Sequence, residues 1–174
     1  MAIAGAFNLQ SWIDEHRELL KPPVGNRCIY DNTDFIVMIV GGPNSRKDYH
    51  FNEGEELFYQ LEGDVVVKII DEGKPRDIHI RQGDMFLLPP RTPHSPQRGA
   101  NTVGLVIERK RETVEMDGFQ WYCENCGEKL YEEFEYVTDI VKQLPPIFER
   151  FYGNLEHCTC KKCGTVMEAP KKLV

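Results

Sequence analysis

The sequence predicts a mainly β protein, a sandwich or small barrel, with one helix before it and a separate cysteine module after it. From Cys28 to Lys110, short apolar or alternating segments are separated by turn residues, with no helical segment between them. After Arg111 the composition becomes acidic and aromatic, and two Cys-x-x-Cys pairs follow. A chain of 174 residues can hold one sizeable core and a small appendage.

The first element is a helix expected from Leu9 to Leu20. Ser11 and Asp14 have the spacing of a capping box, and Pro22 and Pro23 would end the helix. Its apolar side chains, expected to pack across a sheet, are Trp12, Ile13, Leu19 and Leu20.

Strands are expected where apolar or alternating segments lie between turn sequences. The segment 35–40 is entirely apolar and rich in β-branched residues, and Gly41, Gly42 and Pro43 close it. A further strand is expected to leave this turn and to carry His50. The other expected strands cover residues 56–61, 64–70, 77–80, 85–88 and 102–108.

The cysteine module is expected to contain short helices. One is predicted around Thr138 to Leu144, ending at Pro145 and Pro146, and a second continues to Tyr152. We therefore expect a β domain with its helix over residues 1–113 and a cysteine module over residues 114–174.

Composition excludes several classes of function. The net charge of −7 disfavours a nucleic-acid surface, which is normally basic. No apolar run approaches the roughly 20 residues that cross a bilayer, so no membrane association is expected. The segment Met1–Phe7 lacks the basic region of a signal peptide. A cytoplasmic location is expected.

Four of the six cysteines form two C-x-x-C-Gly sequences, which favours thiolate metal binding over disulfides. The four are Cys123, Cys126, Cys160 and Cys163. They can close a tetrahedral site like that of rubredoxin or a zinc ribbon. A closed site has no open position for a substrate, so a structural role is favoured over electron transfer. The sulfurs do not distinguish iron from zinc. Cys28 and Cys158 are left over.

A second candidate metal site combines His50, Glu56 and His94. Two imidazoles and one carboxylate bind a divalent metal and leave positions open. A lone strand histidine is more often structural, so the prediction rests on the combination. Arg46 shares the parity of His50, and Arg98 shares that of His94 if its segment is extended, as the neighbouring prolines suggest. A barrel that turns these faces inward would bring all five side chains into one cavity. Burying them together needs compensation, which a bound cation and an anionic substrate would supply.

The spacing of these residues resembles the cupin superfamily. The first cupin motif is matched by His50, Asn52, Glu56 and Gly63, and the second by Gly83, Pro89, Pro93 and His94. The usual H-x-H of the first motif is H-x-N here, which leaves two histidines and one carboxylate. The resemblance implies a cupin barrel, that is, a double-stranded β-helix or jelly roll.

Longer blocks resemble the 3-hydroxyanthranilate 3,4-dioxygenase family. They occur in the family's order over nearly the whole chain, and the cysteine pairs resemble the C-terminal module of its bacterial and fungal form. The matching blocks are residues 21–26, 39–44, 48–50, 56–60, 86–89, 93–98 and 106–109.

This resemblance implies a non-haem Fe2+ enzyme that converts 3-hydroxyanthranilate and O2 to 2-amino-3-carboxymuconate semialdehyde. The reaction lies in the kynurenine pathway, towards quinolinate and NAD. The implied Fe2+ ligands are His50, Glu56 and His94. Arg46 would be catalytic beside the dioxygen. Glu56, Arg98 and Glu108 would contact the substrate, with Glu108 also catalytic. A second Fe or Zn in the four-cysteine site and a homodimer are also implied.

Two other classes of function remain open from the sequence. A non-catalytic cupin could bind a small aromatic acid as a sensor, and the four-cysteine site could serve an electron carrier. For Glu108, the alternative to a catalytic role is a solvated strand end before the basic segment 109–111.

Overall fold

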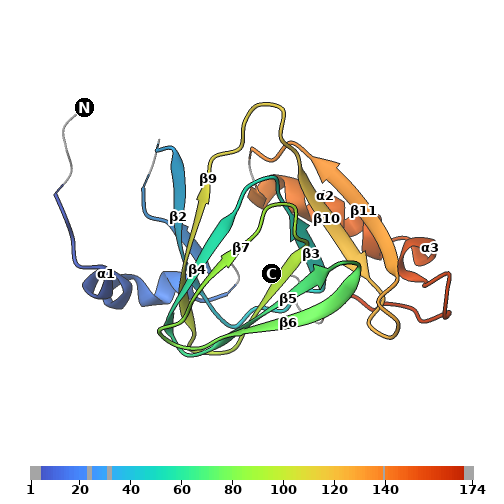
Figure 1. Ribbon diagram of the computed structural model, residues 1–174, viewed down its shortest axis with the longest axis horizontal. Helices are drawn as coiled ribbons and strands as arrows, with labels where there is room; N and C mark the ends of the chain where they lie inside the picture. The colour runs from blue at the N-terminus through green and yellow to red at the C-terminus, as the bar shows by residue number, and fades with distance from the viewer. Residues whose placement is uncertain (1–4, 23–24, 31–32, 139, 171–174) are drawn as a thin grey trace.

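Two antiparallel sheets form the body of the molecule in the computed structural model, which describes residues 5–22, 25–30, 33–138 and 140–170 (Figure 1). The strands are β1 (Asn26–Cys28), β2 (Phe35–Gly41), β3 (Asp48–Phe51), β4 (Glu56–Glu62), β5 (Val65–Asp71), β6 (Lys74–Ile80), β7 (Met85–Leu88), β8 (His94–Arg98), β9 (Val103–Arg109), β10 (Asp117–Tyr122) and β11 (Lys129–Glu135). The sheet orders are β1-β2-β9-β4-β7 and β11-β10-β3-β8-β5-β6. The predicted mainly β fold is confirmed.

The main core lies between the two sheets. It is built from buried side chains of both sheets, namely Phe58, Val65, Val67, Ile69, Ile80, Leu88 and Val106. On β4 the buried positions alternate as Glu56, Phe58 and Gln60, because successive strand side chains point to opposite faces. The same inward face therefore carries a core phenylalanine and, at the strand start, a carboxylate.

The N-terminal helical segment has the predicted bounds, but its last four residues form a 3-10 turn. An α-helix, α1 (Leu9–His16), continues as a 3-10 turn, η1 (Arg17–Leu20). The N-cap is Asn8, whose side chain accepts a 2.8 Å hydrogen bond from the Ser11 backbone, so the predicted Ser11 cap was wrong. Buried Ile13 and Leu20 pack against Ile39 and Val103 of the five-stranded sheet. Pro23 lies outside the described residues.

Most predicted strands are present within one to three residues, but the sequence did not predict β1, β10 and β11. The residues of β10 from Asp117 to Trp121 are all buried, so this strand shows no polar–apolar alternation. It pairs with β3 on one side and with β11 on the other. Residues after position 114 thus extend the six-stranded sheet. The predicted domain boundary itself stays a prediction.

The C-terminal helices differ from the prediction. A single helix, α2 (Ile140–Tyr152), passes through Pro145 and Pro146, where two helices were expected. Proline inside a helix costs about 3 kcal/mol. Packing offsets this cost, because Ile147 and Phe151 are fully buried against Trp121, with the Trp121 and Phe151 rings stacked at 4.4 Å. A short helix, α3 (Leu155–Cys158), follows. Among the described residues, no helix is long and apolar enough to cross a membrane.

Candidate active site

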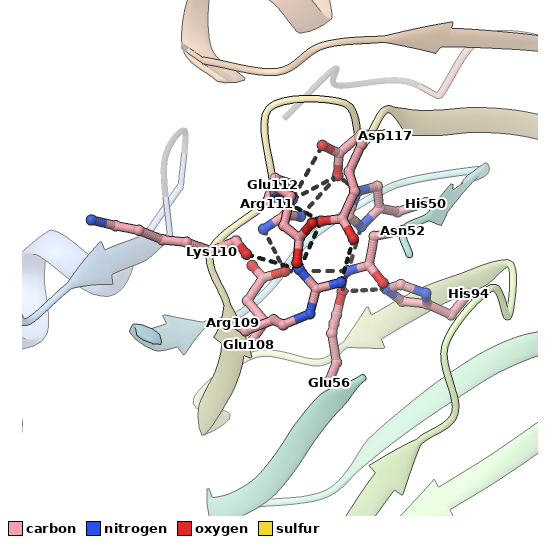
Figure 2. A network of polar contacts seen from close by, with 11 residues as sticks. His50, Asn52, Glu56, His94, Glu108, Arg109, Lys110, Arg111, Glu112 and Asp117 are labelled. Atoms are coloured by element: carbon pink, nitrogen blue, oxygen red, sulfur yellow. Dashed lines mark hydrogen bonds and ion pairs between the residues drawn. The ribbon is translucent and has the colours of Figure 1, made fainter. Parts of the chain in front are cut away.

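The three predicted metal ligands come together at one end of the space between the sheets. His50 on β3 and His94 at the start of β8 are direct partners in the antiparallel pairing, and their rings lie 5.2 Å apart. Glu56 begins β4 in the opposite sheet and points towards both rings (Figure 2). Glu56 and His94 are the first residues of their strands, so both are positioned at strand ends.

The donor atoms of these side chains fit one divalent cation. Glu56 Oε1 lies 3.6 Å from His50 Nδ1 and 3.2 Å from His94 Nε2, and the three donor atoms lie within 4.8 Å of one another. Ligands about 2.1 Å from a cation and at right angles lie about 3 Å apart. Two imidazoles and a carboxylate form the facial set that leaves other coordination positions free.

The charged side chains of the site shift the pKa values of His50 and Glu56. Burial lowers the pKa of His50, but hydrogen bonds with Asp117 and Glu56 outweigh it and raise the pKa to about 9. Burial by itself raises the pKa of Glu56, whereas His94 and His50 lower it well below its usual range. The cluster therefore attracts positive charge, which a metal ion would supply in place of protons.

Asn52 occupies the position of the missing cupin histidine and is buried. Its amide donates hydrogen bonds to Glu56 Oε1 at 2.8 Å and to Glu108 Oε2 at 3.2 Å. The two glutamates are register partners on β4 and β9. Burial and the charge of Glu56 raise the pKa of Glu108. Glu108 is therefore a buried group beside the ligands, and the alternative of a solvated strand end is wrong.

Arg98 is a buried cation with little compensation. Its side chain hydrogen-bonds Gln60 Oε1 at 3.5 Å, and within the described part of the chain it makes no ion pair. Burial and the nearby Arg46 charge lower its pKa to about 10. An isolated buried charge is costly, so this position is suited to an anionic ligand.

Asp48 holds the side chain of Arg46 near Arg98 and Glu56. The two side chains form an ion pair of 2.5 Å, and Asp48 raises the pKa of Arg46 against the lowering effect of burial. Asp48 is buried on β3, two residues before His50. Arg46, Arg98 and Glu108 thus all lie close enough to Glu56 for its charge to shift their pKa values.

Two residues that the sequence did not single out complete the cluster. Asp117, at the start of β10, accepts a 2.6 Å hydrogen bond from His50 Nε2. Arg111 forms ion pairs with Asp117 at 2.8 Å and with Glu108 at 2.7 Å. No spacing pattern relates Asp117 to His50, because 67 positions separate them.

The four predicted cysteines form a second, separate cluster. Sγ of Cys123 lies 3.6 Å from that of Cys163, and Cys126 and Cys160 are separated by the same distance. Four thiolates about 2.3 Å from a tetrahedral ion lie about 3.8 Å apart, whereas a disulfide is about 2 Å long. The cluster therefore fits a four-thiolate metal site. Cys158 is buried elsewhere, with Sγ 3.3 Å from the Phe151 carbonyl.

The two cysteine knuckles have matching backbone structure. Gly127 and Gly164 donate to the carbonyls of Cys123 and Cys160, each at 2.9 Å. Both glycines have positive φ, 73° and 75°, which side chains other than glycine rarely adopt. Contact with the Thr165 hydroxyl lowers the pKa of Cys163 to about 5. The two local turns thus bring the four sulfurs together, as a shared metal ion requires.

Fold and site together define a mainly β, metal-binding dioxygenase with a histidine–glutamate site and a four-cysteine cluster. A sequence model of the 3-hydroxyanthranilic acid dioxygenase family matches residues 1–152, and the chain belongs to this family. The 3-hydroxyanthranilate 3,4-dioxygenase of Xanthomonas euvesicatoria is 56% identical over 95% of this chain and 94% of its own length. That of Jannaschia sp. is 52% identical over 95% and 93%.

Among solved structures, a cupin-2 domain containing protein from Shewanella frigidimarina is similar to part of the chain. It has 18% sequence identity and a TM-score of 0.45, and the match covers 60% of this chain and all of that one.

Proposed function

We propose that this chain catalyses ring opening of 3-hydroxyanthranilate by O2, which gives 2-amino-3-carboxymuconate semialdehyde, a precursor of quinolinate and NAD. The observation that carries the proposal is the convergence of His50, Glu56 and His94 near the buried Arg98, which forms no ion pair within the described part of the chain. Metal ligands with open positions and a cation without a carboxylate partner suit an anionic aromatic substrate. The family membership supports the same reaction.

Arg98 would anchor the substrate carboxylate. A guanidinium donates two parallel hydrogen bonds to a carboxylate, which fixes orientation as well as charge. Arg98 lies on β8 four residues after His94, on the same face of the strand. A substrate bound to Arg98 would therefore extend its ring towards the metal ligands, with Glu56 at its edge.

The proposed catalytic metal is Fe2+, held by His50, Glu56 and His94. When bound, it supplies the redox chemistry through which O2 reacts with an aromatic ring. The donor set supports this choice, since the two-histidine, one-carboxylate set is typical of non-haem Fe2+ oxygenases.

Glu108 and Arg46 would take different catalytic roles. Burial and the Glu56 charge raise the pKa of Glu108, which suits a group that accepts a proton from the substrate hydroxyl or amine and later returns it. Arg46 stays cationic beside Asp48, so it can stabilise negative charge that develops on oxygen. The division places proton transfer on β9 and charge stabilisation next to β3.

The four-cysteine site is proposed to hold a structural Fe or Zn. Ring cleavage that incorporates both atoms of O2 needs no external electron, so an electron-transfer role is not required. Two of the cysteines lie in the loop after β10 and two in the segment after α3. A bound metal ion would hold these two segments together.

A homodimer in the cytoplasm is also proposed. Support for the dimer comes from apolar side chains near the N-terminus, where Phe7, Leu19 and Phe35 expose 44%, 46% and 60% of their surface. Support for the location comes from the four thiolates, which persist in a reducing compartment. Light scattering during size-exclusion chromatography tests the dimer.

The test of the proposed function is an O2-consumption assay. The protein is first loaded with Fe2+ under anaerobic conditions and is then assayed in oxygenated buffer. Addition of 3-hydroxyanthranilate should consume one O2 per substrate and produce the absorbance of the semialdehyde. His94→Ala should reduce turnover to background, whereas the matched control His79→Ala, an exposed histidine on β6, should not. Wild-type turnover by His94→Ala would contradict the assignment. Substrate binding without O2 consumption would favour the sensor function.

A further inference from the structure

The two nitrogen atoms of His50 have different partners. Nδ1 faces Glu56 Oε1 at 3.6 Å, on the side of the metal-ligand cluster. Nε2 lies 2.6 Å from Asp117 Oδ1, on the side away from the cluster (Figure 2). The histidine ring therefore bridges the candidate metal position and a buried carboxylate.

A neutral imidazole has one N–H donor and one nitrogen lone pair. Asp117 accepts a hydrogen bond and has no proton to give when it is ionised, so the N–H must be at Nε2. The lone pair is then at Nδ1, which is the nitrogen that faces Glu56. Carboxylates that hold metal-bound histidines in this way fix the ring orientation and make the imidazole a stronger ligand.

We infer that Asp117, held in place by Arg111, is a positioning residue that keeps the metal ligand His50 in its binding tautomer and orientation. The inference rests on the proposed function only in its statement about turnover, because the metal-binding part concerns the protein alone. It also means that a residue beyond position 114 contributes to the catalytic site.

Arg111 fixes the position of Asp117. Its Nε contacts both carboxylate oxygens of Asp117 at 3.2 Å, and a terminal nitrogen contacts Oδ1 at 2.8 Å. Another terminal nitrogen reaches Glu108 Oε2 at 2.7 Å. Asp117 is 1% exposed, so its charge depends on these partners rather than on water. One guanidinium therefore links the partner of a metal ligand to the proposed proton acceptor.

The other histidine ligand is held differently. His94 Nδ1 contacts the backbone carbonyl of Thr92 at 3.0 Å, and its Nε2 faces Glu56. A backbone carbonyl cannot be removed by substitution, whereas Asp117 can be changed. The effect of Asp117 on the metal site can thus be measured while the second histidine stays fixed.

The experiment is titration of metal-free protein with Co2+, whose visible absorption separates nitrogen and oxygen ligation from thiolate ligation. Asp117→Asn should weaken binding at the histidine–glutamate site by about 10- to 100-fold. Binding at the four-cysteine site should not change. With saturating Fe2+, the KM for 3-hydroxyanthranilate should stay within about 2-fold while kcat falls, because the hydrogen bonds of Asp117 go to His50 and Arg111 and not to the proposed substrate anchor Arg98.

The matched control is Asp71→Asn. Asp71 also pairs with an arginine at 2.8 Å, Arg76, but on the exposed β5–β6 hairpin. This variant removes the same charge and should bind Co2+ like the wild type. Wild-type Co2+ affinity in folded Asp117→Asn would overturn the inference, as would an increase in KM with no change in metal affinity.

Arg111→Lys is the second variant, in case Asp117→Asn does not fold. Lysine keeps the positive charge but loses the forked contact with Asp117, so affinity for Co2+ should fall by about 3- to 10-fold. Unchanged affinity in Arg111→Lys would overturn the positioning role. If Asp117→Asn weakens Co2+ binding but the Fe2+-loaded wild-type protein consumes no O2 with 3-hydroxyanthranilate, the proposed function fails and this inference stands.

Discussion

Glu56 and Glu108 lie opposite each other on β4 and β9, and the amide of Asn52 donates a hydrogen bond to both carboxylates. The partners of the two glutamates differ. Glu56 faces the histidines, which lower its pKa, whereas burial and the Glu56 charge raise the pKa of Glu108. This difference supports the proposed roles of Glu56 as a metal ligand and Glu108 as a proton acceptor.

Asn52→Ala should destabilise the metal-free protein. The change removes a buried donor shared by Glu56 and Glu108, so the free energy of unfolding should fall by about 1–3 kcal/mol. Urea unfolding at neutral pH measures this. The control Gln10→Ala removes an amide-to-carboxylate hydrogen bond of 3.1 Å to Glu62 at the exposed surface and should cost under about 0.5 kcal/mol. Equal stability of the two variants would contradict a bridging role for Asn52.

Arg98→Lys should impair recognition of the substrate carboxylate. Lysine keeps the charge but cannot form two parallel hydrogen bonds, so KM for 3-hydroxyanthranilate should rise by about 10- to 100-fold, with a smaller effect on kcat. Steady-state kinetics with 2-aminophenol, which lacks the carboxylate, provide the comparison. The preference for the carboxylated substrate should shrink in Arg98→Lys and persist in the exposed control Arg76→Lys. An equal loss of kcat/KM for both compounds would argue against Arg98 as the carboxylate anchor.

The sequence predicted the residues around the metal site well because turns fix them. Glu56 and His94 start strands directly after turns, and strand periodicity then places Gln60 and Arg98 on the same faces as these ligands. His50 was expected on a strand leaving the turn at Gly42. Local rules of this kind need no knowledge of the distant chain.

The parts that the sequence did not predict depend on contacts between distant segments. Asp117 meets His50 only because β10 pairs with β3, and nothing in the sequence near either residue indicates this pairing. The continuous helix α2 contradicts the local effect of Pro145 and Pro146, because burial of Ile147 and other apolar side chains against Trp121 outweighs it. Tertiary packing decided both cases.

Glu115→Gln should alter the acid limb of the stability curve. Hydrogen bonds from the Arg109 guanidinium and the Glu112 backbone lower the pKa of Glu115 to about 2, below its ordinary value of 4.5. A group with a lowered folded-state pKa stabilises the fold above its unfolded pKa, and this stability is lost as pH falls from about 4.5 to about 2. The ion pair between Arg109 and Glu115 spans the segment that contains Arg111.

The difference in stability between wild type and Glu115→Gln should therefore be constant above about pH 5 and disappear near pH 2. Urea unfolding at a series of pH values measures it. Glu149→Gln, an exposed carboxylate on α2, is the control and should show a smaller difference over this range. A difference that grows as the pH falls would have the wrong sign for this contact.

Cys126→Ser should remove the metal of the four-cysteine site and leave the other site occupied. A hydroxyl is a poor ligand for a thiolate site, so metal content should fall from two ions per chain to one, with loss of thiolate charge-transfer absorption. Because the ion would clamp the segment after β10 to the segment after α3, the Tm should fall as well. Cys28→Ser, an exposed cysteine outside the cluster, should keep both ions and the wild-type Tm. Two ions per chain in Cys126→Ser would show that the cluster does not bind metal through all four cysteines.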